Sequence, residues 1–94
     1  MKWKLKYSKR ADKQLEKLDK SVSKIITQWL LKNINNSDNP RKFGKLLTGG
    51  DLAGQWRYDI GDYRVICDIQ DENVIVLALN VRHRSKIYKR KNLY

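Results

Sequence analysis

The sequence of 94 residues has one cysteine, one histidine and one proline. A lone cysteine cannot form an intrachain disulfide, so nothing indicates secretion, and a reducing cytoplasm is the expected setting. There is no cysteine and histidine cluster for a structural zinc site, and the acidic residues show no metal-ligand motif. We therefore expect no metal and no cofactor.

Long apolar segments are also missing. The longest strongly apolar run has six residues, 74–79, whereas a bilayer requires about 20, so no membrane partner is expected. Residues 1–6 alternate lysine with bulkier side chains and lack the continuous apolar stretch of a signal peptide. The length predicts a single domain, residues 1–94, because domains typically have about 100–150 residues.

Acidic residues are scarce: 10 Asp and Glu stand against 21 Lys and Arg, for a formal net charge of +11. Two basic zones, 1–50 and 82–94, flank residues 51–72, which are net negative. This excess indicates a polyanionic partner, with nucleic acid favoured over a membrane surface. Since 40% of the residues are hydrophobic, the chain can build a small core and is not a disordered basic tail.

The N-terminal half predicts one strand and two helices. Residues 3–7 alternate between bulky residues and lysine, as in a half-buried edge strand. Ser8 then resembles a helix N-cap, and apolar residues recur at spacings of three and four. We expect Ser21 to cap a second helix that ends near residue 33, followed by a polar cluster and an irregular connection over 42–54.

The C-terminal half has the two-residue period of strands, at 55–60, 63–69 and 74–82. Gly61-Asp62 fits a two-residue primed turn, and residues 71–73 fit a three-residue loop with Asn73 in the left-handed conformation. The element order predicts an α+β fold, in which an N-terminal strand and two-helix hairpin pack on one face of a mainly antiparallel sheet of four to five strands.

The strand register predicts which side chains share a face. The first turn pairs Asp59 with Arg64, and a three-residue second loop pairs Arg64 with Asn80. Ile75, Leu77, Leu79 and Val81 would then join the core, while Asn80 and Arg82 would share the open face with Arg57 and Arg64. A second loop of even length would reverse this last assignment.

Arg57, Arg64 and Arg82 would therefore span three strands on the open face. These are either ordinary solvated arginines or a cradle for a phosphodiester, because the forked donors of arginine suit phosphate oxygens. Asp59 lies opposite Arg64 and has three possible roles: a structural ion pair, an orienting contact, or partial cancellation of the attraction for phosphate.

Four segments together resemble the RelE/ParE superfamily of bacterial and archaeal toxins: 55–58 (QWRY), 61–66 (GDYRVI), 71–77 (DENVIVL) and 83–88 (HRSKIY). The resemblance covers roughly residues 3–90 and implies a RelE-like fold and a type II toxin with a cognate antitoxin. RelE-like members cleave mRNA on the ribosome without a metal, whereas ParE-like members poison DNA gyrase. The free toxin is expected to be a monomer or weak dimer.

By match to RelE-like toxins, Arg64 takes the position of the sheet arginine at the scissile phosphate. Arg84 matches the arginine after the last strand, and Tyr88 matches the C-terminal functional tyrosine. Arg57 matches the first of two basic positions on the preceding strand, but the second is Asp59 here. This departure argues against a lysine-assisted proton abstraction at that position.

Cleavage through the 2′-OH requires a base, an acid and charge stabilisation at phosphate. One histidine excludes a two-histidine pair, but His83 could serve as base or acid because histidine titrates near neutral pH. Tyr88 could stack on a base or hydrogen-bond the 2′-OH. The predicted catalytic residues are thus Arg64, Arg84, Tyr88 and His83, and the predicted RNA-binding residues are Arg57, Arg82, Lys45 and Lys86.

Three functions are compatible with these features. The first is a ribosome-dependent mRNA endonuclease that inhibits translation in the cytoplasm. The second is a gyrase-directed toxin without nuclease activity, and the third is a non-catalytic nucleic-acid-binding module. The joint presence of Arg64, the His83-Arg84 pair and Tyr88 favours the first.

Overall fold

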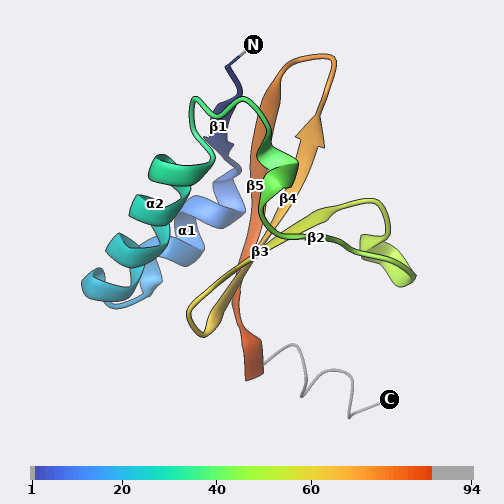
Figure 1. The fold of residues 1–94 in the computed structure, drawn as a ribbon. Coiled ribbons are helices and arrows are strands. Elements are labelled where there is room, and N and C mark those ends of the chain that lie inside the picture. Colours follow the sequence, from blue (N-terminus) through green and yellow to red (C-terminus); the bar gives the residue numbers. More distant parts are fainter. Residues whose placement is uncertain (1, 86–94) are drawn as a thin grey trace.

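The computed structural model describes residues 2–85, in which two helices lie on one side of a five-stranded mixed sheet (Figure 1). The strand order is β1-β5-β4-β3-β2; β1 pairs parallel with β5, and the other pairs are antiparallel. This confirms the expected α+β fold. The strands are β1 (Lys4–Tyr7), β2 (Lys45–Leu46), β3 (Trp56–Ile60), β4 (Tyr63–Gln70) and β5 (Ile75–His83).

The two helices are α1 (Lys9–Lys17) and α2 (Lys20–Asn33). The Ser8 hydroxyl accepts a hydrogen bond from the Ala11 amide at 3.1 Å, which confirms the predicted N-cap. The predicted cap at Ser21 is wrong. The Ser23 amide already bonds the Asp19 carbonyl at 3.0 Å, so helical hydrogen bonding starts at Asp19 and Ser21 lies inside α2.

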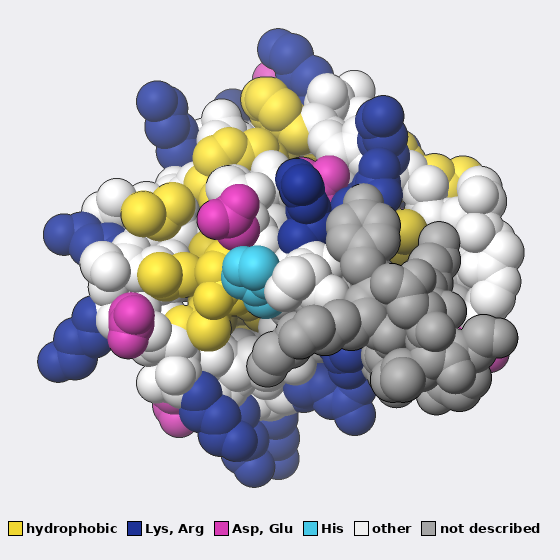
Figure 2. Space-filling view, turned by 90° about the horizontal axis from the view of Figure 1, so that it is seen from below, with side chains coloured by type: hydrophobic (Ala, Val, Ile, Leu, Met, Phe, Trp, Pro, Cys, Tyr) yellow, Lys and Arg dark blue, Asp and Glu magenta, His cyan; other side chains and the backbone are white. Residues whose placement is uncertain are grey.

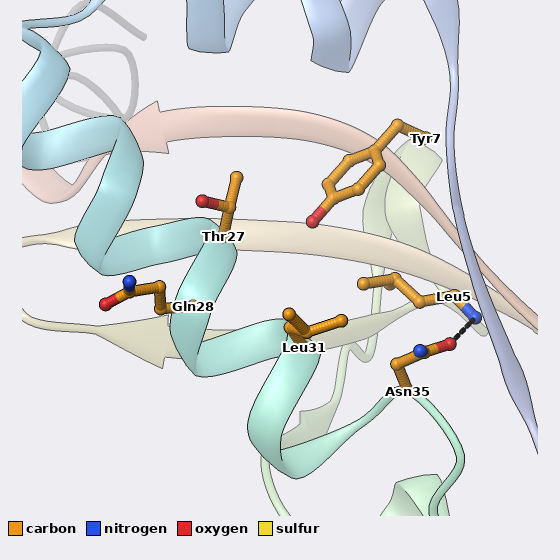
Figure 3. Close-up of a pocket in the computed structure, with 6 residues that line it drawn as sticks. All are labelled: Leu5, Tyr7, Thr27, Gln28, Leu31 and Asn35. Atoms are coloured by element: carbon orange, nitrogen blue, oxygen red, sulfur yellow. Dashed lines mark hydrogen bonds between the residues drawn. The ribbon is translucent and has the colours of Figure 1, made fainter.

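The outer edge of β1 is covered by the polar cluster that follows α2. Asn35 Oδ1 accepts a hydrogen bond from the Leu5 amide at 3.1 Å (Figure 3), and the Asn36 amide donates to the Trp3 carbonyl at 2.8 Å. Beside this edge a groove of about 270 Å³ lies between β1 and α2. It is lined by Leu5, Tyr7, Thr27, Gln28, Leu31 and Asn35. The side chains after the helix therefore protect the edge strand together with its lysines.

The hydrophobic core lies between the helices and the sheet face that they cover. Its buried members are Ala11, Leu15, Ile26, Leu30, Ile34, Tyr58, Ile60, Val65, Cys67, Val76, Ala78 and Val81. Cys67 is fully buried and packs as a small hydrophobic residue, and burial raises the pKa of its thiol to about 12. The three tryptophans pack against this cluster.

The β3–β4 hairpin has the predicted register. Gly61 adopts a φ of 59°, as a primed turn requires, and Asp59 lies directly opposite Arg64. The side chains of β3 and β4 therefore alternate as expected between the core and the face away from the helices.

The β4–β5 connection differs from the prediction. Gln70 pairs with Ile75, so the loop has four residues, and Val74 rather than Asn73 has a positive φ, of 55°. An even loop shifts the strand by one residue, and the core therefore receives Val76 and Ala78. The assignments of Ile75, Leu77 and Leu79 to the core are wrong.

A β-bulge then restores the predicted alternation. Cys67 pairs with Ala78 and Ile66 with Asn80, which leaves Leu79 as one extra residue in β5. Val81 is consequently in the core as predicted, and Arg82 lies directly opposite Arg64. The predicted pairing of Arg64 with Asn80 is wrong by two residues.

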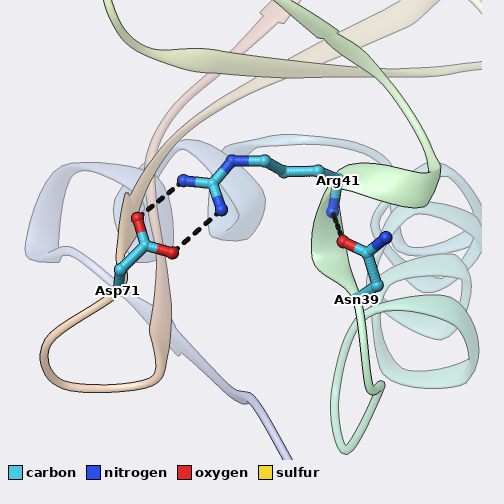
Figure 4. Close-up of polar contacts among 3 residues, drawn as sticks. All are labelled: Asn39, Arg41 and Asp71. Atoms are coloured by element: carbon cyan, nitrogen blue, oxygen red, sulfur yellow. Dashed lines mark hydrogen bonds and ion pairs between the residues drawn. The ribbon is translucent and has the colours of Figure 1, made fainter.

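The connection before β3 is more ordered than predicted. It contains β2 and two 3₁₀ turns, η1 (Pro40–Lys42) and η2 (Gly50–Leu52). Arg41 in η1 makes a bidentate ion pair with Asp71 of the β4–β5 loop, with N–O distances of 2.9 and 2.8 Å (Figure 4). Asn39 Oδ1 accepts from the Arg41 amide at 3.0 Å and fixes the turn from which Arg41 projects. Within residues 2–85, no helix is long and apolar enough to cross a membrane.

Gly44 tests how tightly β2 packs on β3. A Cβ at Gly44 would lie 2.1 Å from the Arg57 carbonyl oxygen, whereas one at Gly49 would meet nothing within 4 Å, although both glycines have φ near +80°. We expect Gly44→Ala to lower the free energy of unfolding by about 1–3 kcal/mol more than Gly49→Ala does. Urea unfolding of both variants measures this, and equal losses would contradict the described packing.

The Arg41–Asp71 pair predicts a pH-dependent contribution to stability. The hydrogen bond from Arg41 lowers the pKa of the Asp71 carboxyl. A lowered native pKa stabilises the fold above the unfolded-state value, near 4, and this stability is lost as pH falls through the native pKa. We expect Asp71→Asn to lower the melting temperature slightly at pH 7 and to have no effect at pH 2. An equal effect at both values would show that the carboxylate charge is not involved.

Candidate functional site

Four basic side chains lie on the sheet face away from the helices, which we call the arginine face: Lys45, Arg57, Arg64 and Arg82. The register places Arg82 of β5 directly opposite Arg64 of β4, and Lys45 of β2 opposite Arg57 of β3. Directly opposed residues share a face with Cβ atoms about 4.5–5.5 Å apart. The structure thus brings together three of the predicted RNA-binding residues and one predicted catalytic residue.

Arg64 lies at the centre of this face and is held by Asp59. Its Nε donates to Asp59 Oδ1 at 2.8 Å, which confirms that these opposed residues pair. Arg64 is only 9% exposed, whereas the Asp59 side chain is 45% exposed. Arg57 Nε lies 4.0 Å from the other Asp59 oxygen. One carboxylate is therefore shared unequally by two arginines, and the more buried one has the shorter contact.

Arg82 is connected to α1 through two amide side chains. Its Nε donates to Asn80 Oδ1 at 3.4 Å, and Gln14 Nε2 donates to the same oxygen at 2.7 Å. Gln14 Oε1 accepts from the Val81 amide at 2.5 Å. Gln14 thus bonds the strand just after the bulge and positions the residue that contacts Arg82.

Sequence reasoning placed Asn80 on this face but did not identify either amide residue as part of the site. A glutamine on the exposed side of a helical stripe gives no signal for such a role. The bulge that brings the two residues together also has no mark in the sequence, since Leu79 is an ordinary strand residue.

His83 lies on the opposite side of β5 from Arg82, because it pairs with Tyr63 on the helix side. The two rings meet edge to face, with centroids 5.1 Å apart. The Ser85 amide donates to Nδ1 of His83 at 3.1 Å, so the neutral ring carries its proton on Nε2. The structure therefore separates the histidine from Arg64 and leaves Nε2 as its available donor.

A groove of about 580 Å³ adjoins the histidine, between α1 and the ends of β4 and β5. Its lining residues are Gln14, Lys17, Leu18, Tyr63, Val81, Arg82 and His83. In Figure 2 the single histidine, in cyan, has hydrophobic side chains on one flank. Its lining thus combines apolar side chains with the basic Lys17 and Arg82.

Of the other predicted residues, Arg84 is exposed. Its amide donates to the Asp62 carbonyl at 2.9 Å, which ties the end of β5 to the β3–β4 turn. Lys86 and Tyr88 lie outside the described residues. In the described part of the chain, no three His, Cys, Asp or Glu side chains are grouped so that they could hold a metal ion.

Comparison with known proteins identifies the family. The model described as "ParE toxin of type II toxin-antitoxin system, parDE" matches residues 5–88. The chain belongs to the RelE/ParE superfamily of type II toxins. The family match extends from β1 through the arginine face into the C-terminal segment, and it agrees with the resemblance found in the sequence.

Individual relatives lie on the RelE side of this superfamily. A curated relative, Toxin RelG of Mycobacterium tuberculosis, is 30% identical over 96% of this chain and 100% of its own length. The structure resembles a toxin–antitoxin complex of M. tuberculosis, RelBE2, with a TM-score of 0.78 and 26% identity over 90% of this chain and 94% of the other. It also resembles the archaeal RelE–RelB complex of Pyrococcus horikoshii, with a TM-score of 0.67 and 26% identity over 92% and 99%.

The Gln14 contacts in this toxin predict a measurable effect on stability. Gln14→Leu would leave the Val81 amide without its acceptor, and an unsatisfied buried donor typically costs about 1–3 kcal/mol. Gln28→Leu is the matched control, because Gln28 is exposed on α2. Chemical denaturation should show a loss of this size for Gln14→Leu and a smaller change for Gln28→Leu. Equal effects would mean that Gln14 does not hold the bulge.

Proposed function

We propose that this toxin is a ribosome-dependent mRNA endonuclease that inhibits translation. The observation that carries the proposal is the direct opposition of Arg64 and Arg82 at the centre of the arginine face. Two guanidinium groups on adjacent strands can bracket one phosphate, and arginine is suited to bidentate contacts with phosphate oxygens. Such a pair of like charges destabilises a sheet unless an anion lies between or beside them.

The proposed reaction is an attack of the 2′-OH on the adjacent phosphorus atom. The P–O2′ bond forms, the bond to the 5′ oxygen breaks, and the products are a 2′,3′-cyclic phosphate and a 5′-hydroxyl. Arg64 and Arg82 hold the scissile phosphate, and Arg84 joins Arg64 in stabilising the negative charge that grows on its oxygens. A proton must leave the 2′-OH and another must reach the 5′ oxygen.

Two further residues are proposed to act on the reacting groups, and of these His83 is proposed for proton transfer. His83 can donate from Nε2, because Nδ1 accepts the Ser85 amide. The His83 side chain starts on the other side of β5 from the arginine face. For His83 to act at a phosphate on that face, the RNA would have to extend around the end of β5. Tyr88 remains a candidate that stacks on a base or contacts the 2′-OH. Lys45, Arg57 and Lys86 are proposed to bind flanking phosphates.

The proposed partners are the ribosome with its mRNA and a cognate antitoxin. The antitoxin is supported by the two solved complexes above, whose similar toxins are paired with antitoxins. Dependence on the ribosome is proposed from the resemblance to RelE-like toxins. A site that consists of a few side chains on a small sheet suits an RNA that is held and oriented by a larger body.

A gyrase-directed toxin is the second candidate, and the observation that favours it is the family description, which names a ParE toxin. The fold alone does not distinguish the two activities, because function depends on the residues of the site. The arginine pair and the similarity to RelE-type relatives favour mRNA cleavage.

The test is a translating extract to which the purified protein is added, with mRNA ends mapped by primer extension. We expect cuts in phase with codons, and a loss of about 100-fold or more in Arg64→Ala, as when one donor that stabilises a transition state is removed. Arg10→Ala removes the same charge from the exposed side of α1 and should cut at the wild-type rate.

Intact mRNA together with trapped gyrase–DNA cleavage complexes would contradict the proposal and establish the second candidate. If the extract shows neither cut mRNA nor trapped gyrase, the protein acts by binding alone. Equal losses in Arg64→Ala and Arg10→Ala would show that net charge, not the arginine face, determines activity.

A further inference from the structure

Asp59 is an acidic residue in the middle of a basic surface, and two roles can be distinguished by geometry. If it lowers the positive charge of the surface, its carboxylate weakens RNA binding. If it orients Arg64, its carboxylate is required for activity. The two roles predict opposite effects of removing it.

The contact between the two residues uses one particular edge of the guanidinium. Asp59 Oδ1 accepts from Nε of Arg64 at 2.8 Å, and within residues 2–85 this is the hydrogen bond that Arg64 donates. A guanidinium can bind an oxyanion through its Nε edge or through its two Nη groups. With Nε bonded to Asp59, the two Nη groups are left for a second acceptor.

Arg82 also donates its Nε to a side-chain oxygen, in a longer contact with an uncharged acceptor on its own strand. Its Nε donates to Asn80 Oδ1 at 3.4 Å, and Asn80 is itself bonded to Gln14. Both members of the opposed arginine pair are thus held at Nε by an oxygen from the sheet. Without these acceptors two adjacent guanidinium groups would repel one another and turn apart.

Burial argues for orientation rather than for cancellation of charge. Arg64 is 9% exposed and therefore depends on a partner for its desolvated charge, whereas the Asp59 side chain is 45% exposed. Water screens the long-range field of an exposed carboxylate, but it does not remove the direction of a 2.8 Å hydrogen bond.

We propose that Asp59 is a positioning residue, whose carboxylate holds Arg64 through Nε so that both Nη groups face the scissile phosphate. The inference rests on the proposed nuclease function. It also assigns a role to the acidic side chain of Asp59, which stands at a position that matches a basic residue in RelE-like toxins.

The variants that test it are Asp59→Ala, Asp59→Asn and Asp68→Asn. Asparagine keeps an oxygen acceptor for Nε without the charge, while alanine removes both. Asp68 lies on the same face of β4 and contacts Gln70, so Asp68→Asn removes an equal charge without touching an arginine. The readouts are the single-turnover cleavage rate at saturating ribosome–mRNA, the apparent affinity, and the Arg64 Nε–H resonance in NMR spectra.

Positioning predicts a fall of about 10- to 100-fold in the single-turnover rate of Asp59→Ala, since small misplacements of a catalytic group have effects of this size. Asp59→Asn should recover most of that rate, and Asp68→Asn should match the wild type. The Arg64 Nε–H signal should be protected from exchange in the wild type and in Asp59→Asn, and lost in Asp59→Ala.

Faster cleavage and tighter RNA binding by both Asp59 variants would overturn the proposal in favour of charge cancellation. A wild-type rate in folded Asp59→Ala would reduce the contact to a structural ion pair. If the wild-type protein cuts no mRNA, the proposed function itself fails. Affinity for a 2′-O-methyl RNA then decides the positioning role: orientation predicts weaker binding by Asp59→Ala, and cancellation predicts stronger binding.

Discussion

The extra residue in β5 determines which side chains of this strand lie on the arginine face. The four-residue loop before β5 reverses the alternation of its side chains, and the bulge at Leu79 reverses it again. Without that bulge, Arg82 would point into the core and Val81 would replace it opposite Arg64. The bulge is in turn held by Gln14, whose side chain bonds the Val81 amide. A helix residue therefore contacts the backbone arrangement that places Arg82 on the opposite face of the sheet.

The arginine face contains a nearly buried cation, which an ordinary solvated surface does not. A central cation that is 9% exposed requires an acceptor, and Asp59 supplies one at 2.8 Å. The same contact occupies Nε and leaves both Nη groups of Arg64 for a further acceptor. The net charge of +11 attracts polyanions in general, and this attraction weakens as the salt concentration rises. Under the proposed function, a specific reaction depends on the few arginines whose orientation is fixed.

Much of the fold follows from local patterns in the sequence. The edge strand, the Ser8 cap and the β3–β4 register were predicted because alternation and turn chemistry determine them locally. The loop length before β5 and the bulge were not, because Asp71-Glu72-Asn73 and Leu79 carry no mark of either. The predicted loop was one residue too short, and the extra residue of the bulge was missed. Each error reverses the alternation of side chains, so together they left Arg82 on the correct face. The link from Gln14 to the site depends on tertiary packing and has no local signal.

The central claim is that Arg64 and Arg82 hold the scissile phosphate between them. The most direct measurement is a structure of this toxin on a ribosome with mRNA whose attacking 2′-OH is methylated. The account predicts phosphate oxygens within hydrogen-bond distance of the Nη groups of Arg64 and of Arg82, with the Arg64 Nε bond to Asp59 retained. An mRNA that contacts only the N-terminal lysines or the groove beside His83, with Arg64 bonded to Asp59 alone, would contradict it.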